Sequence, residues 1–318
     1  MTRVSLVERG SLRSMDGLRY MVLAGPTGVG KTDIAIRIAQ SVHTEIVGAD
    51  AFQIYQGLDI LSCKPTRSQL LAVRHHLISS LPLTESCDAH KYAVLARRAI
   101  SRLNQNGIVP LVVGGTGFYL RALESSLPEL PPADYSLRGE LDQRSTTDLL
   151  AELEARDRLA SNRIDRHNRR RIIRALEVCI LSKKPYSGFL TESVPDHSIP
   201  RLFIQRPRAI LFEKINLRVD QMFAQGVVAE VDAVKAIGPT ASKAIGFKLI
   251  RSLIAGTIDT HRCREAIQQQ TRNYAKRQMI WFRHQPYEIA AAESAVTRAI
   301  RLFQRVRYGF DGSQNSSG

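Results

Sequence analysis

Residues 21–42 read MVLAGPTGVGKTDIAIRIAQSV, and this stretch decides the fold class. A short apolar run stops at Gly25 and Pro26, and apolar residues then recur at helical spacing over residues 31–42. The order is therefore strand, loop and helix. The connecting segment, GPTGVGKT at residues 25–32, fits the pattern G-x-x-x-x-G-K-S/T between the two elements that this motif requires.

The loop predicts a phosphate-binding site. Its glycines allow consecutive backbone N–H groups to point into one concavity, and the N-terminus of the following helix adds its dipole. Lys31 supplies a cation for the outer phosphate, and the Thr32 hydroxyl can hold the Mg²⁺ ion that we expect as cofactor. A glycine-rich turn without a ligand is the alternative, which the agreement of strand, loop and helix disfavours. The phosphate-binding residues would be Gly25, Pro26, Thr27, Gly28, Val29, Gly30, Lys31 and Thr32. The reaction stays open, because ATPases, kinases and other transferases share this loop.

Three further apolar runs extend the pattern. They read TEIVGAD, which ends at Asp50, IVPLVVGG at residues 108–115, and RLFIQRP at residues 201–207. Helical spacing precedes the second run, and strands that alternate with helices predict a parallel sheet. We therefore predict an α/β fold in which a P-loop NTPase-like parallel sheet is flanked by helices. Residues 210–308 should be almost wholly helical.

The sequence between residues 128 and 200 has a different texture, charged and rich in arginine at helical spacing. It starts after the proline cluster SLPELPPAD and closes with the loop SVPDHSIP, which predicts an inserted all-helical subdomain. The expected organisation is a disordered N-terminus at residues 1–18, a catalytic domain at residues 19–127 and 201–308, the insertion at residues 128–200, and a disordered tail at residues 309–318.

Composition points to a polyanionic partner. The 318 residues carry a formal net charge of +15 and a pI near 10.0, and a basic surface of this kind attracts nucleic acid. The four cysteines form no C-x-x-C pair, so neither a zinc site nor a disulfide framework is suggested. The first twenty residues contain no apolar core of a signal peptide, and no run of about 18 apolar residues occurs. We expect a cytoplasmic protein without a membrane partner.

Asp50 stands where chemistry is expected, at the C-terminal end of the second predicted strand. Open parallel sheets place their ligands at this edge. The carboxylate could act as a general base there. It could equally hold magnesium through water or cap the segment that follows, and its position alone leaves these roles open.

Several blocks of the sequence resemble the tRNA dimethylallyltransferase family in order and spacing. They are GPTGVGKT, EIVGADAFQIYQGLDILSCKPT and LVVGGTGFYLRAL, followed by RRRIIRALEV, LRVDQMFAQGVVAEV, KAIGFK and TRNYAKRQMIWFR. The resemblance spans roughly residues 22–283, and independent blocks in one order are harder to obtain by chance than the phosphate loop alone.

The resemblance implies a transfer reaction at tRNA. The exocyclic amine of the adenine at position 37, beside the anticodon, would attack the first carbon of dimethylallyl diphosphate, and diphosphate would leave. Asp50 would take the amine proton. Lys31, Thr32 and Mg²⁺ would neutralise charge on the leaving group, and Arg218 would clamp the diphosphate. The product would be N6-(dimethylallyl)adenosine.

The resemblance also implies how tRNA is held. Because a stacked adenine cannot reach a buried donor, the enzyme must extrude the base while the insertion grips the anticodon stem-loop. The tRNA-contacting residues would be Asp50, Ala51, Phe52, Gln53, Thr116, Arg138, Arg170, Arg171, Ile172, Ile173, Arg174, Lys243, Ala244, Ile245, Gly246, Phe247 and Lys248. The arginines of residues 169–174 recur at helical spacing, so part of the cluster shares a face that phosphates could meet. A solvated or internally paired face is the alternative.

Some positions depart from the family pattern. Ala51 follows Asp50 where a hydroxyl residue is common, residues 165–168 read DRHN, and Lys214 stands where an arginine is common. The lack of clustered Cys and His excludes the C-terminal zinc finger of the eukaryotic branch and favours a bacterial-type enzyme, which we expect to be a monomer.

Three rival functions remain. A small-molecule phosphoryl transferase would leave the basic insertion unexplained, and a nucleic-acid-binding ATPase would release phosphate on binding RNA. An enzyme that prenylates free adenine nucleotides would have no use for the insertion.

Overall fold

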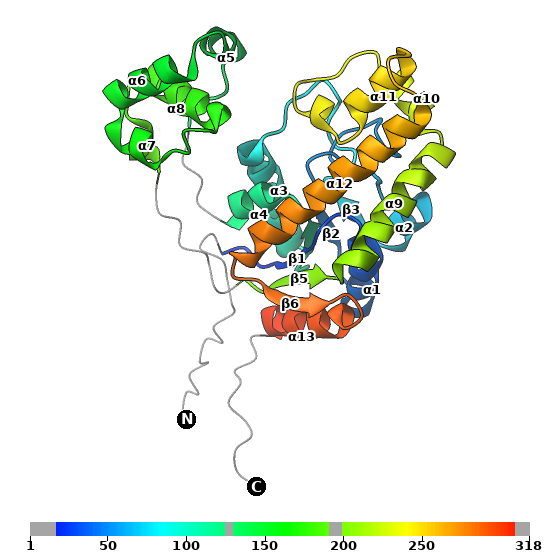
Figure 1. The fold of residues 1–318 in the computed structure, drawn as a ribbon. Helices are drawn as coiled ribbons and strands as arrows, with labels where there is room; N and C mark the ends of the chain where they lie inside the picture. Colours follow the sequence, from blue (N-terminus) through cyan, green and yellow to red (C-terminus); the bar gives the residue numbers. More distant parts are fainter. Residues whose placement is uncertain (1–16, 125–129, 191–198, 309–318) are drawn as a thin grey trace, which may run out of the picture. The chain divides into compact units, whose positions relative to one another are not determined.

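The computed structural model describes residues 17–124, 130–190 and 199–308 (Figure 1). These residues divide into two compact units, one built from both ends of the chain and one from the residues between them. The first unit holds residues 17–124 and 199–308, and the second holds residues 130–190, inside the expected insertion of residues 128–200. Apart from residues 17 and 18, the two ends expected to be disordered lie outside the described residues.

The first unit contains a six-stranded sheet in the order β3-β2-β4-β1-β5-β6, with every neighbouring pair parallel. The strands are β1 Met21–Ala24, β2 Ile46–Ala49, β3 His75–His76, β4 Leu111–Gly114, β5 Arg201–Gln205 and β6 Glu288–Ala291. The predicted parallel α/β sheet is confirmed, and the four apolar runs form its four central strands. The prediction that residues 210–308 are almost wholly helical missed β6, and no strand was expected at β3.

The helices of the first unit follow the strands along the chain. They are α1 Lys31–Val42, α2 Arg67–Ala72, α3 Ala89–Gln105, α4 Gly117–Glu124, α9 Arg208–Ala224, α10 Val227–Asp232, α11 Phe247–Ile254, α12 Thr260–Arg283 and α13 Ala295–Tyr308, with the short 3-10 helix η2 Ala241–Lys243. Local capping sets several of the starts. The Asp88 side chain accepts from the Lys91 N–H at the start of α3, and Asp259 does the same for Arg262 at the start of α12. None of the helices in the described part of the chain is both long and apolar enough to cross a membrane.

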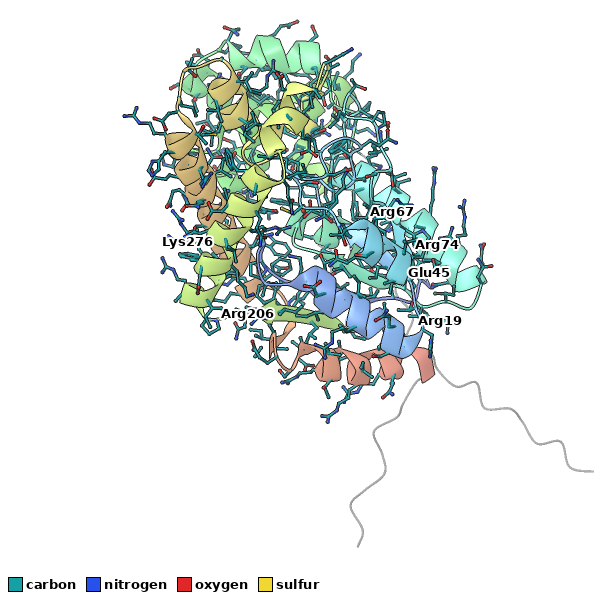
Figure 2. All side chains as sticks on the ribbon, turned by 90° about the vertical axis from the view of Figure 1, so that its right-hand side faces the viewer. Arg19, Glu45, Arg67, Arg74, Arg206 and Lys276 are labelled. Carbon is teal, nitrogen blue, oxygen red and sulfur yellow. The ribbon has the colours of Figure 1, made fainter. Side chains whose placement is uncertain are left out.

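Neither edge strand has an alternating apolar pattern, and β3 is only two residues long. In β3, His75 pairs with Ile46, and the Nε2 atom of His76 lies 2.5 Å from Glu45 Oε2. Glu45 also faces the exposed Arg74, whose Nε atom is 3.9 Å away (Figure 2). One of the two histidines, His76, therefore ties this edge strand to the Glu45 carboxylate directly before β2.

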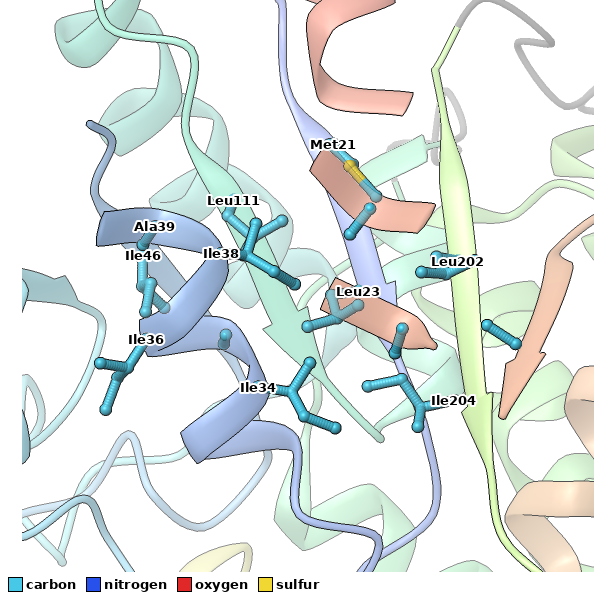
Figure 3. Close-up of a cluster of buried hydrophobic side chains, with 14 of the residues drawn as sticks. Met21, Leu23, Ile34, Ile36, Ile38, Ala39, Ile46, Leu111, Leu202 and Ile204 are labelled. Atoms are coloured by element: carbon cyan, nitrogen blue, oxygen red, sulfur yellow. The ribbon is translucent and has the colours of Figure 1, made fainter. Parts of the chain in front are cut away.

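Helices cover both faces of the sheet, so the central strands are buried on each side. Alternate residues of β1 point in opposite directions: Met21 and Leu23 pack with α1 and α13, as Figure 3 shows, and Val22 and Ala24 pack with α3 and α4. This double burial explains why the central strands read as near-continuous apolar runs.

A third apolar cluster fixes the segment after β2 to the C-terminal helices. Leu58 and Leu61 pack among residues of α9, α10, α11 and α12. Glu230 of α10 accepts hydrogen bonds from the N–H groups of Ile60 and Leu61, both at 2.8 Å. The chain between β2 and α2 is thus held by helices that are more than 150 residues away in sequence.

The second unit is helical throughout its described residues. It comprises α5 Tyr135–Asp142, α6 Thr146–Arg156, α7 Arg158–Arg163, α8 Arg169–Ser182 and the 3-10 helix η1 Tyr186–Phe189. Side chains of Asp134, Ser145, Asp157 and Asn168 cap the starts of the four α-helices. Apolar residues of α5, α6, α7 and α8 form a core of their own, so this unit buries its own hydrophobic surface.

Candidate active site

The phosphate loop joins β1 to α1 at the carboxyl edge of the sheet. Gly28 and Gly30 have φ angles of 82° and 95°, in the left-handed region that glycine adopts without strain. No side chain caps the start of α1, so its first N–H groups are open to an anion in the loop. Arg206, directly after β5, braces the loop by donating to the Val29 carbonyl at 3.1 Å (Figure 2). The geometry is that of a phosphate cradle.

Lys31 turns back over this loop. Its Nζ atom donates to the carbonyl oxygens of Gly25 and Pro26, both at 2.9 Å. Burial lowers the pKa of Lys31 to about 8; the nearby Asp50 carboxylate opposes the shift and the Arg218 guanidinium adds to it. These influences show that Lys31, Asp50 and Arg218 share one electrostatic neighbourhood.

Asp50 follows β2 and is half-buried. Its Oδ1 atom accepts from the N–H groups of Phe52 at 2.9 Å and Gln53 at 3.3 Å, so this oxygen caps the turn after the strand. Among the described residues, no hydrogen bond reaches the other carboxylate oxygen. One oxygen therefore has a structural task, and the second can accept a proton from a substrate.

Thr116 lies beside Asp50 because the turn after β4 is tied to the turn after β2. The Thr116 hydroxyl accepts from the Ala51 N–H at 3.1 Å, and the Thr116 N–H donates to the Ala49 carbonyl at 3.4 Å. Tyr274 of α12 lies beside Thr116 and Asp50. Burial raises the pKa of its phenol to about 12, with Asp50 adding to the shift and hydrogen bonding to Thr116 opposing it.

Arg218 reaches the site from α9. Its Nη1 atom lies 3.5 Å from the Thr27 hydroxyl, and its Nη2 atom donates to the Cys63 carbonyl at 3.2 Å. The guanidinium therefore spans the phosphate loop and the segment after β2. A planar fork in this position suits a diphosphate, which it can contact through two parallel hydrogen bonds.

The other residues expected at tRNA in the first unit follow two segments. Ala51, Phe52 and Gln53 form the turn after Asp50, and the Gln53 amide donates to the carbonyls of Ser62 and Cys63. In the segment of residues 243–248, Lys243 and Lys248 are exposed and Ile245 is half-buried. Ala244 and Phe247 pack in the core, and Gly246 starts α11 with a φ of 92°. The exposed lysines are the side chains that this segment offers to a partner.

The arginine cluster of the second unit divides into paired and exposed members. Arg138 and Arg174 both donate to Glu177, whose side chain is fully buried, with the shorter contacts at 2.8 and 2.5 Å. Arg169 donates to backbone carbonyls at the end of α5 and just beyond it. Arg170 and Arg171 are exposed, whereas Ile172 and Ile173 lie in the core. Internal pairing thus accounts for part of the cluster, and Arg170 and Arg171 form the exposed part.

Sequence reasoning assigned no role to Gln278, although it touches two elements of the site. It accepts from the Thr27 N–H of the phosphate loop and donates to the Gly115 carbonyl beside Thr116. Gln278 belongs to the block TRNYAKRQMIWFR, where Tyr274, Gln278 and Trp281 recur at helical spacing and face the same corner. This helical spacing was the signal in the sequence that could have pointed to Gln278. Ordinary core residues of a helix show the same spacing, so it does not distinguish the two.

Thr32, the predicted magnesium ligand, is the second residue of α1 and is half-buried beside the loop. The described ranges contain no group of three or more His, Cys, Asp or Glu side chains placed to hold a metal ion. A magnesium ion that kept several waters and bound mainly to substrate phosphates would need no such group.

Comparison with known proteins agrees with this geometry. A family model described as IPP transferase matches residues 53–285. A tRNA dimethylallyltransferase from Leuconostoc citreum is 36% identical over 271 residues, which cover 84% of this chain and 91% of that protein. A tRNA dimethylallyltransferase from Syntrophobacter fumaroxidans is 37% identical over 305 residues, which cover 91% and 89%.

Solved structures give the same result. The full-length tRNA isopentenylpyrophosphate transferase of Bacillus halodurans is 27% identical, with a TM-score of 0.66 over 92% of this chain and 97% of that one. The match of the family model, the coverage of the relatives and the shared fold confirm the resemblance seen in the sequence blocks. The chain belongs to the IPP transferase family.

Proposed function

We propose that the protein transfers a dimethylallyl group from dimethylallyl diphosphate to the exocyclic amine of the adenine at tRNA position 37. The observation that carries this proposal is that Lys31 and Arg218 contact the phosphate loop, while Arg218 also shares the Cys63 carbonyl with Gln53, whose N–H bonds to Asp50. Two cations suit a diphosphate leaving group, and a carboxylate with one unbonded oxygen suits an amine that must lose a proton.

The diphosphate half of the donor is assigned to the loop and its cations. The uncapped N–H groups at the start of α1, the Lys31 ammonium and the Arg218 guanidinium all lie at this loop. In the reaction a bond forms between the amine nitrogen and the first carbon of the donor. The carbon–oxygen bond breaks at the same carbon, and its electron pair leaves with diphosphate. Donors fixed in this position stabilise charge that grows only as the bond breaks.

The proton of the attacking amine is assigned to Asp50. Its Oδ1 atom is held by the Phe52 and Gln53 N–H groups, which fixes the carboxylate while its other oxygen takes the proton. The Thr116 hydroxyl accepts from the N–H of Ala51, the residue that follows Asp50. It is therefore placed to contact the acceptor base. Correct placement of the amine adds to the effect of proton transfer, because it removes the entropy cost of encounter.

Magnesium fits the site as an ion shared between protein and substrate. The Thr32 hydroxyl would hold it, together with donor phosphate oxygens and water. When bound, the ion would neutralise negative charge on the diphosphate.

The second unit is assigned to the tRNA anticodon stem-loop. Its exposed Arg170 and Arg171, with Lys243 and Lys248 of the first unit, supply cations for phosphates. We further propose that the protein acts as a monomer in the cytoplasm, which the absence of a membrane-crossing helix in the described part of the chain permits.

The test is incubation of the protein with unmodified tRNA, labelled dimethylallyl diphosphate and Mg²⁺, followed by digestion to nucleosides. We expect label on the adenosine at position 37 and none when that position carries guanosine. AMP in place of tRNA tests for prenylation of free nucleotides, and ATP tests for phosphate release. Absence of label with turnover of ATP would replace this proposal by phosphoryl transfer.

A further inference from the structure

Gln278 is a buried polar side chain that joins two loops of the site. It lies in α12 and is 6% exposed. Its Oε1 atom accepts from the Thr27 N–H at 2.8 Å, and its Nε2 atom donates to the Gly115 carbonyl at 2.7 Å. The partners fix the orientation of the amide, because a backbone N–H only donates and a carbonyl only accepts.

The turn after β4 packs so closely against α12 that its two glycines, Gly115 and Gly117, have no free space for a side chain. A Cβ atom on Gly115 would stand 2.4 Å from Gln278 Nε2 and 2.8 Å from the Gly25 carbonyl. A Cβ atom on Gly117 would stand 2.6 Å from the Trp281 ring. A side chain at Gly115 would therefore push against the backbone of the phosphate loop, and one at Gly117 would displace the Trp281 ring. The face of α12 that carries Gln278 and Trp281 therefore packs directly against the backbone of this turn.

The helix that carries Gln278 is itself firmly anchored. Toward its end, Phe282 stacks on Phe203 of β5 with ring centroids 4.8 Å apart. Nearer its start, Cys263 and Ile267 are buried in the cluster formed with α9, α10 and α11. A side chain between two such anchors moves little, so its two partners are held at a fixed separation.

The hydrogen bonds of Gln278 belong to a longer chain of contacts. They run from Thr27 in the phosphate loop through Gln278 to Gly115, and the next residue, Thr116, accepts from the Ala51 N–H beside Asp50. The loop assigned to the donor and the turn assigned to the acceptor are thereby linked through one amide.

We infer that Gln278 is a positioning residue that sets the separation between the phosphate loop and the turn that carries Thr116. The inference rests on the proposed function for the identity of the donor and acceptor. Gln278 touches neither reacting atom in this account. Its effect is to hold the two substrates in register, and a misplacement of about 1 Å can slow a transfer by about 100-fold.

The test compares Gln278→Met with Thr271→Val in single-turnover transfer. Methionine has a similar shape but leaves the Thr27 N–H and the Gly115 carbonyl without a partner. Thr271 is the matched control, because it is also a buried polar residue of α12, and within the described ranges its hydroxyl bonds only to the Ile267 carbonyl of the same helix. We expect Gln278→Met to lower the transfer rate about 10- to 100-fold and Thr271→Val to change it by less than about threefold.

Two readouts separate positioning from a general loss of structure. The affinity for tRNA should stay within about twofold of the wild type, because the hydrogen bonds of Gln278 go to the Thr27 N–H and the Gly115 carbonyl and not to a residue assigned to tRNA phosphates. In a double-mutant cycle, Gln278→Met and Thr116→Val should be less than additive in the transfer rate, because the first substitution already disturbs the turn that carries Thr116. A transfer rate for Gln278→Met that matches Thr271→Val, or strictly additive effects, would overturn the inference.

A second variant, Gln278→Asn, keeps the inference testable if Gln278→Met does not fold. Gln278→Asn keeps the amide but is one methylene shorter, so it cannot span both partners. Full transfer activity in folded Gln278→Asn would also overturn the inference. Calorimetric binding of inorganic diphosphate with Mg²⁺ distinguishes the two proposals. If the wild type transfers no prenyl group, the proposed function fails, yet weaker diphosphate binding by Gln278→Met would still show that the amide shapes the phosphate loop.

Discussion

Lys31 is the residue whose protonation links the phosphate loop to pH. Burial lowers the pKa of its ammonium to about 8 in the free protein, with Asp50 opposing the shift and Arg218 adding to it. A bound diphosphate brings negative charge beside the ammonium and raises its pKa again. Binding therefore takes up a proton once the pH exceeds the value in the free protein.

This linkage predicts how donor affinity depends on pH. Below pH about 8, Lys31 is already protonated, so its contribution to affinity is constant. Above that value the affinity should fall by at most about tenfold per pH unit until the pKa of the complex is reached. Calorimetry in two buffers of different ionisation enthalpy measures the proton uptake directly.

The control for this prediction is Lys31→Arg. A guanidinium stays protonated throughout the range, so what remains of the pH dependence belongs to the diphosphate. An identical proton uptake in Lys31→Arg and in the wild type would show that Lys31 does not titrate in the site.

At the residue scale, sequence alone located the phosphate loop and Asp50 because their chemistry follows a local pattern. GPTGVGKT is contiguous, and Asp50 ends a strand with a clear apolar run. Gln278 could not be found in this way. Its partners, Thr27 and Gly115, are 251 and 163 residues away, and no local pattern records a hydrogen bond over that distance.

At the scale of elements, α9 brings one guanidinium to the phosphate loop. Lys214 lies one turn before Arg218 on the same helix, and its side chain is exposed. We expect Arg218→Ala to lower kcat/KM for the donor about 10- to 100-fold, the range of a lost charge-assisted hydrogen bond. Lys214→Ala removes the same charge from the same helix and should leave kcat/KM within about twofold.

The lysine substitution at position 218 tests geometry against charge. Arg218→Lys keeps a cation but loses the planar fork, so it should recover only part of the activity. Steady-state rates with varied donor and saturating tRNA decide the matter. Equal rates in the wild type and in Arg218→Ala would remove the clamp from this account.

In the second unit, Glu177 of α8 holds the packing of α5 and the loop before it. It accepts from Arg138, Arg174 and the Asp134 N–H, and its side chain is fully buried. Although burial opposes the charged form, hydrogen bonds from Arg138 and Arg174 hold the pKa of Glu177 below its usual value. The carboxylate therefore stabilises the folded unit above the unfolded pKa, and this contribution is lost as the pH falls through the folded pKa.

We expect Glu177→Gln to cost about 1–3 kcal/mol in the free energy of unfolding of this unit at pH 7. The difference from the wild type should shrink at acidic pH. Hydrogen exchange of α8 amides measures this energy locally. Glu152→Gln is the control, because Glu152 also accepts from two arginines, Arg144 and Arg156, but its side chain is 22% exposed. A loss no greater than that of Glu152→Gln would contradict the structural task of Glu177.

At this scale the four central strands were predictable and the two edge strands were not. Central strands are buried on both faces and show it as apolar runs. In β6 only Ala290 is buried, and Ile289 is 48% exposed, so EIAA carries no strand pattern. In β3 the two residues are histidines, and the strand depends on pairing with β2. Both edge strands therefore form because they pair with a neighbouring strand, and not because of their own sequence pattern.

At the scale of the whole molecule, the net charge of +15 has to be assigned to surfaces. Composition set the arginine-rich insertion apart from the rest of the chain, but it could not tell which arginines were already paired. Arg138, Arg169 and Arg174 have partners inside the unit, and Arg170 and Arg171 are exposed. The pairing depends on Glu177 and on the backbone carbonyls near the end of α5, which only the folded unit brings into reach.

This division predicts the salt dependence of tRNA binding. The double substitution of Arg170 and Arg171 by alanine should weaken tRNA binding and lower the slope of log affinity against log salt by about 1–2. Filter binding or fluorescence titration over several salt concentrations measures the slope. A matched double substitution of Arg67 and Arg74 removes two exposed charges from the α2–β3 edge of the first unit (Figure 2). If both double variants changed the slope equally, only overall charge would matter.

The central claim is that one site combines the phosphate loop with a base at Asp50, and Asp50→Asn tests it most directly. Asparagine can still accept the Phe52 and Gln53 N–H bonds through one oxygen, so the turn is kept while the base is lost. The measurement is single-turnover transfer of labelled dimethylallyl to tRNA at saturating donor and tRNA. We predict transfer by the wild type and a rate at least about 100-fold lower in Asp50→Asn, with affinities for both substrates within about threefold. An unchanged rate in Asp50→Asn would contradict the claim.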